Sequence, residues 1–160
     1  MVKFLEKYLT PVIWGVRIAI VLGFAVMAAI QIFGGYFFWT GATLSTGNKI
    51  AVSATAIIGF TAAEVVGWCL WKMLTLVKND LVFSHESFRF VDVTMVAMVI
   101  GAISIQVFGF LVAATDDAPG AVLFGAFLAI MIAGAGFIVA VLRMLLSRAL
   151  SMQTELGEVI

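Results

Sequence analysis

One carboxylate, Glu64, lies in the middle of the apolar stretch IIGFTAAEVVGWCLWK at residues 57–72. At about 1.5 Å per residue, it falls close to the midplane of any helix that crosses a membrane there. A charged acid at that depth costs on the order of 3 kcal/mol, so we expect it to face other helices and to find hydrogen-bond donors or stay protonated. The candidate partners are Thr61, Gln31 and Gln106.

Two interpretations of Glu64 remain open. It is either a protonatable or cation-binding group of a carrier or channel, or a neutral carboxyl that fastens helices together. Carriers usually add discontinuous helices, inverted repeats or several acids along a path, and these are not evident in the sequence. The sequence therefore favours the structural interpretation.

Three further charges, Arg17, Asp92 and Arg143, lie within about two helical turns of the same end of their apolar segments. An ion pair between Asp92 and one of the arginines would lower the cost of placing both in the membrane, although arginine also extends toward lipid headgroups. We expect a structural ion pair.

No set of residues indicates catalysis, a cofactor or a metal. The single histidine, His85, has Ser84 and Glu86 beside it but no activated nucleophile, and no zinc-protease or phosphate-loop motif occurs. Ser84 instead fits the N-cap of a helix, with Glu86 in the first turn. The only cysteine, Cys69, excludes an internal disulfide and is expected to pack. We do not expect an enzyme.

The elements that carry these residues are membrane helices. The chain has 160 residues, of which 64% are hydrophobic and 11% charged, and a mean hydropathy of +1.19. The apolar segments are too long and too uniform for barrel strands and long enough for helices. We therefore expect an all-α, four-helix integral membrane bundle forming one domain, 1–160. The expected helices are 12–38, 50–77, 90–114 and 121–146.

The basic residues predict the orientation. Short cytoplasmic loops collect Lys and Arg. If the N-terminus, the loop 78–89 and the tail 147–160 share one side, that side holds Lys3, Lys7, Arg17, Lys72, Lys78, Arg89, Arg143 and Arg148, and the other holds Lys49. Both termini are therefore expected in the cytoplasm. The net charge of zero gives no reason to expect direct nucleic-acid binding.

The outer turn TDDAPG has an ordinary explanation. Asp116 or Asp117 can cap the start of the fourth helix, and Pro119 fits its first turn. Two acids are too few for a dedicated calcium site. The fourth helix also carries a seam of small residues that would let another helix, internal or from a second copy, approach closely: Gly125, Ala129, Ala133, Gly136 and Ala140.

Three stretches are similar to the domain of unknown function 2975 family. They are the loop NDLVFSHESFRFVDVTMVA, the turn TDDAPGAVLFGAFLAI and the tail VLRMLLSRALSMQTELGEVI, so the likeness is clear over 79–160 and lies in layout alone before that. Phe83, Ser84 and Ser87 match the family's loop, while His85 differs. The resemblance implies a small bacterial plasma-membrane protein with four helices, often encoded beside a small helix-turn-helix regulator, and it supplies no catalytic residues.

That setting suggests a cytoplasmic surface for a small transcription regulator. The tail could present an apolar strip to a partner helix or lie on the bilayer, and the protein could also form homo-oligomers. The candidate surface comprises Lys78, Asp80, His85, Glu86, Arg89, Glu155 and Leu156.

Overall fold

A computed structural model describes residues 2–41, 44–78, 85–116 and 119–157, with side chains within 11–41, 44–77, 87–115 and 119–152. The regular structure in these ranges is helical, which confirms the all-α prediction. In chain order the elements are α1 (Val2–Ala29), the π-helical segment η1 (Ile30–Gly34), α2 (Gly35–Gly41), α3 (Thr46–Lys78), α4 (His85–Asp116) and α5 (Pro119–Gly157).

Four stretches are long and apolar enough to cross a membrane, which indicates a multi-pass membrane protein. They are Pro11–Gly41, Thr46–Val77, Ser87–Thr115 and Pro119–Met152. The helices extend beyond the segments expected from hydropathy because polar residues continue the hydrogen-bonded ladder after the apolar run has ended. α4 begins at His85 rather than at residue 90, and α5 continues to Gly157 rather than ending near residue 146.

The first crossing is interrupted by η1. Here α1 passes into one short π-helical stretch and then into α2, and the Gly35 N–H contacts the carbonyl oxygens of both Gln31 and Ile32. A π-helical stretch inserts an extra residue into a helix and rotates the side chains that follow, and such stretches are frequent at functional sites. Gln31 lies within this segment.

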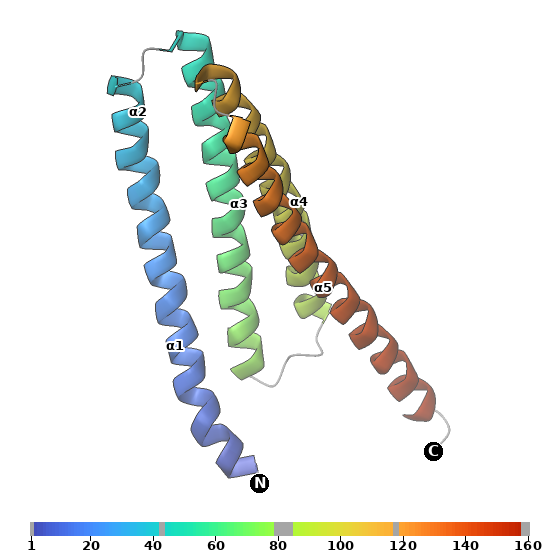
Figure 1. Cartoon of the computed structure of the whole chain (residues 1–160). Helices are drawn as coiled ribbons and strands as arrows, with labels where there is room; N and C mark the ends of the chain where they lie inside the picture. The colour runs from blue at the N-terminus through green and yellow to red at the C-terminus, as the bar shows by residue number, and fades with distance from the viewer. Residues whose placement is uncertain (1, 42–43, 79–84, 117–118, 158–160) are drawn as a thin grey trace.

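The helices pack mainly with their neighbours in the chain. α3 lies along α4, and α4 along α5, whereas α1 contacts α3 at fewer places. Figure 1 shows α1 standing to one side of α3, with both chain ends, the C-terminal end of α3 and the N-terminal end of α4 at the same end of the molecule. The apolar window of the first crossing has no buried residue, so α1 is the least enclosed of the four spans.

Small residues allow α3, α4 and α5 to approach closely. The buried side chains are Val52, Ala62, Cys69, Ser87, Thr94, Ala97 and Ser104. A Cβ at Gly59 would lie 3.4 Å from the Cβ of Ser104, and one at Gly109 would lie 2.8 Å from the Ala121 carbonyl oxygen. Because lipid tails are as apolar as leucine, such close backbone packing is a main source of helix association in membranes.

Two residues of the predicted seam on α5 pack inside the protein. A Cβ at Gly125 would lie 3.1 Å from the Ile105 carbonyl oxygen, and one at Gly136 would lie 3.9 Å from Met98. Both neighbours are on α4, so this part of the seam joins α4 to α5 within one chain, whereas Ala133 is exposed. Cys69 is free and buried, and packs as expected.

Candidate functional site: polar contacts and an apolar groove

Glu64 accepts a hydrogen bond from Gln31. The Gln31 Nε2 donates to Glu64 Oε1 at 2.9 Å, and both side chains are partly buried. The bond joins η1 to α3 inside both spans, at the place where the π-helical stretch sets the direction of Gln31. Glu64 lies near the middle of its span, whereas Gln31 lies ten residues before Gly41, where the first span ends. A donor at this depth lowers the cost of the carboxyl in either protonation state, because amide donors bond to carboxyl and carboxylate oxygens alike.

The other two candidate partners lie elsewhere. Gln106 is on α4, beside Gly125 of α5, and α4 does not face α1. Thr61 is exposed and lines a shallow apolar groove between α3 and α4 that reaches Asp92. Within the described residues, neither is bonded to Glu64, because Glu64 faces α1 and not α4.

Asp92 pairs with Arg143, joining α4 to α5. The Arg143 Nη2 donates to Asp92 Oδ2 at 2.7 Å, and Nε lies 2.6 Å from Oδ1 as a charge contact without hydrogen-bond alignment. The guanidinium carbon also lies 6.0 Å from the centroid of the Phe88 ring. The two side chains are 46% and 37% exposed, so this is a boundary ion pair and not a fully buried one.

Arg17 does not join that pair. Its Nη2 donates to Thr75 Oγ1 at 3.1 Å, and its guanidinium lies 5.0 Å from the centroid of the Trp71 ring. The Nε atom is covered by protein and has no hydrogen-bond partner. The reason is the order of the helices: α1 packs on α3, which places Arg17 on α3 and away from Asp92 on α4.

A third polar contact holds the first crossing to α3 at the opposite end. The Trp39 Nε1 donates to Ser53 Oγ at 3.1 Å, and the Lys49 Nζ donates to the Trp39 carbonyl oxygen at 3.1 Å. No sequence pattern predicted this contact. A tryptophan near the end of a span could have indicated it, but a tryptophan at that position is equally typical of a residue that anchors the span at the membrane surface.

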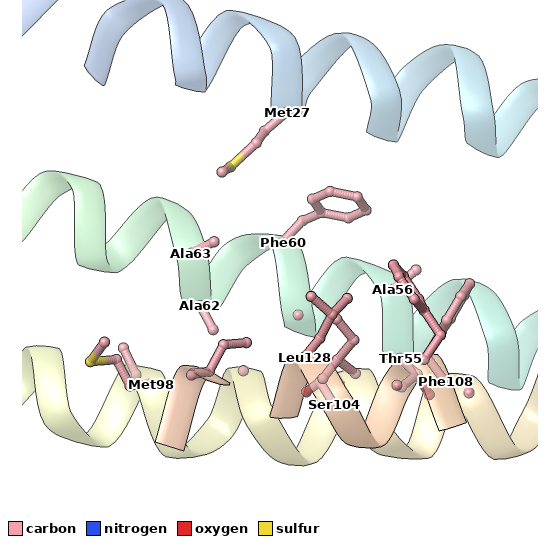
Figure 2. A pocket seen from close by; sticks show the side chains of 18 of the residues that line it. Met27, Thr55, Ala56, Phe60, Ala62, Ala63, Met98, Ser104, Phe108 and Leu128 are labelled. Carbon is pink, nitrogen blue, oxygen red and sulfur yellow. The ribbon is translucent and has the colours of Figure 1, made fainter. Parts of the chain in front are cut away.

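An apolar groove of about 560 Å³ lies among the four spans. Figure 2 shows Met27 of α1 and Phe60 of α3 pointing into the space between those helices, with Leu128 of α5 nearby. Its lining also includes small residues at which α3, α4 and α5 approach one another: Gly59, Ala62, Gly101, Ser104, Gly109 and Gly125. Glu64 is not among the residues that line it, so this groove does not lead to the midplane acid.

The candidate partner surface is described only in part. Arg89 is exposed on α4. Lys78, His85, Glu86, Glu155 and Leu156 lie on helices with backbones but not side chains described, and Asp80 and the predicted N-cap Ser84 lie outside the described residues. At the other end, Asp116 closes α4 and Pro119 opens α5, whereas Asp117 is outside the described residues.

In the described part of the chain, no His, Cys, Asp and Glu side chains gather in a group that could hold a metal ion. The polar contacts instead join neighbouring helices in pairs: α1–η1–α2 to α3 at three levels, and α4 to α5 at one. Such contacts fasten helices in a medium where water is absent. They also leave Arg17 with a charge that no described acid neutralises.

Comparison with known proteins identifies the family of the chain. No curated protein and no solved structure is detectably similar to the chain. The family model described as "Protein of unknown function (DUF2975)" matches residues 6–160, which is nearly the whole chain and includes the first two helices. The match thus extends the resemblance seen in the loop, turn and tail to all four spans, and the chain belongs to the DUF2975 family.

Proposed function

We propose that this protein is a non-enzymatic component of the bacterial plasma membrane that anchors, or senses for, a small cytoplasmic partner such as a helix-turn-helix regulator. Both chain ends and the loop 78–89 would lie in the cytoplasm. The partner would dock on the loop and on the end of α5.

The length of α5 is the observation that carries the proposal. Its 39 residues form one continuous helix, Pro119–Gly157, about 58 Å long at the standard rise. Only about 30 Å of that length is needed for the hydrocarbon core. The C-terminal turns therefore leave the bilayer as a helix, and a helix with an apolar strip is a common element for docking a partner helix.

The arrangement of the helices supports placing both chain ends and the loop 78–89 on the same side of the membrane. In Figure 1 the C-terminal end of α5, the N-terminus, the C-terminal end of α3 and the N-terminal end of α4 occur at one end of the molecule. That end also carries Arg17, Lys72, Arg89 and Arg148, as expected for a cytoplasmic face. A partner would thus meet the loop and the α5 end together.

The test is crosslinking in native membranes with full-length chain and with a chain ending at Ser147. We expect a specific crosslinked partner with the full-length chain, its loss after truncation, and its weakening by Leu156→Ala or Glu155→Gln. Leu123→Ala is the matched control, since Leu123 is exposed on the same helix at the other end. Capture of the same partner by the truncated chain, or equal weakening by Leu123→Ala, would count against the proposal.

A second candidate is a proton- or cation-coupled carrier or channel subunit that uses Glu64. The observation in its favour is that the bonding partner, Gln31, lies in a π-helical stretch, a feature frequent at functional sites. Against it, the groove among the four spans is apolar and is not lined by Glu64, and neither is the groove between α3 and α4. In reconstituted vesicles, a carrier predicts ion flux that Glu64→Gln abolishes; equal flux for both proteins removes this candidate's main support.

A further inference from the structure

We propose that Arg17 and Lys72 form a binding site for the phosphate headgroup of an anionic phospholipid, in the leaflet at the end of the molecule where both chain ends lie. This inference is independent of the proposed partner. It is based on the charges, the contacts that hold them and their depth in the spans.

No acid among the described side chains neutralises the two cations. These acids are Glu64 and Asp92; Glu64 is bonded to Gln31, and Asp92 is paired with Arg143. Within the described residues, Arg143 is therefore neutralised, whereas Arg17 and Lys72 are not. A site with two positive charges and no negative one favours a headgroup with net negative charge over one that also carries an ammonium group.

The Arg17 guanidinium is held in place before any ligand arrives. Thr75 accepts one of its hydrogen bonds at 3.1 Å, and the Trp71 ring supports its face at 5.0 Å. A guanidinium has five N–H donors in a fixed fork, so one bond to Thr75 leaves others for a planar or tetrahedral oxyanion. Holding the fork in advance reduces the ordering cost of binding.

Lys72 extends the site along α3. It lies three residues before Thr75, which accepts the hydrogen bond from Arg17, and positions three apart are neighbours on a helix. Its Nζ lies 5.3 Å from the centroid of the Trp68 ring, and the side chain is exposed. Each of the two cations is thus held against a tryptophan of α3.

The depth matches lipid phosphates. Arg17 is six residues inside the span Pro11–Gly41, about 9 Å along the helix, and Lys72 is five residues inside the end of Thr46–Val77, about 8 Å. Spans of 31 and 32 residues are about 46 to 48 Å long, close to the full thickness of a bilayer with its headgroups. Both cations therefore lie near the boundary between headgroups and acyl chains.

Native mass spectrometry of the full-length protein in mild detergent tests the site. The probes are phosphatidylglycerol, phosphatidylcholine of the same acyl chains, and inorganic phosphate. We expect retained phosphatidylglycerol to exceed phosphatidylcholine, and Arg17→Gln and Lys72→Gln each to reduce that preference by about tenfold, as for loss of a charge-assisted hydrogen bond. Inorganic phosphate should not displace the lipid.

Arg148→Gln is the matched control, because it removes the same charge from an exposed position on α5. It should keep the wild-type preference. Lys72→Gln also lies at an exposed position, so it tests the site without threatening the fold. An unchanged preference in Arg17→Gln and Lys72→Gln, an equal loss in Arg148→Gln, or displacement of the lipid by inorganic phosphate would each overturn the proposal.

Discussion

At the scale of single residues, the ion pair between Asp92 and Arg143 is the contact that mutagenesis tests most directly. Asp92→Asn leaves Arg143 without its counter-charge, and we expect a loss of about 1 to 2 kcal/mol in the free energy of unfolding, less than for a fully buried pair because both side chains are partly exposed. Arg89→Gln, exposed on the same helix, should change stability by less than about 0.5 kcal/mol. Reversible unfolding in mixed micelles measures both.

The double variant completes this test. If the two residues interact, Asp92→Asn with Arg143→Gln should be less destabilised than the sum of the two single variants. Simple additivity would mean that the observed pairing contributes nothing to stability.

Gln31 supports a second prediction at this scale. Gln31→Leu removes the donor to Glu64 and should cost about 0.6 kcal/mol and at most about 1.7 kcal/mol, the range for hydrogen bonds between membrane helices. Ile32→Leu, at the exposed next position, should be neutral. The same micelle unfolding applies, and equal stability of the two variants would show that the bond does not fasten α1 to α3.

The partner of a polar side chain was predictable only as far as its depth in the membrane limits the residues that it can reach. The sequence gives the depths of Glu64, Gln31 and Gln106, but not which helix faces which. Gln31 bonds to Glu64 and Gln106 does not, because α1 and not α4 faces Glu64. In the same way, depth alone did not decide whether Arg17 or Arg143 pairs with Asp92. The order in which the helices pack decides both pairings, and no local sequence pattern predicts that order.

At the scale of elements, close approach of α4 to α5 depends on Gly109. A methyl group there would lie 2.8 Å from the Ala121 carbonyl oxygen, which is backbone and cannot turn aside, so Gly109→Ala should destabilise the protein by about 1 to 3 kcal/mol. Gly101→Ala on the same helix would meet the Ala62 Cβ at an ordinary 3.8 Å and should be tolerated.

Thermal unfolding in detergent compares the two alanine variants directly. A clear loss for Gly109→Ala with little change for Gly101→Ala is expected. Equal melting temperatures would mean that α4 and α5 are farther apart than the structure has them.

The number of helices was predictable because apolar runs of membrane length are distinctive, and the helix ends were less so. Hydropathy marks where the apolar run stops, whereas the helix itself continues as long as backbone hydrogen bonds do, as in α5 through Gly157. The π-helical stretch at Ile30–Gly34 left no mark in the residue pattern. It is a feature of backbone geometry, and IQIFG contains nothing that excludes a regular helix.

At the scale of the whole molecule, the packing is uneven. Small residues bring α3, α4 and α5 together, while the first crossing is held to α3 by polar contacts at three levels and by the Phe24 ring against Gly67. Because α1 contacts α3 at fewer places than α4 does, the first crossing is the least firmly packed span. This division is consistent with an anchor whose α3–α5 part is constant.

The central claim is that the chain crosses the bilayer four times with both ends in the cytoplasm. Single cysteines in a Cys69→Ala background, labelled with a membrane-impermeant maleimide in intact bacterial cells, test it most directly. Ser45→Cys and Gly120→Cys should be labelled from outside, and Arg89→Cys and Ser151→Cys only after the membrane is permeabilised; all four positions are exposed in the structure. Labelling of Ser151→Cys in intact cells, or protection of Gly120→Cys, would contradict the account.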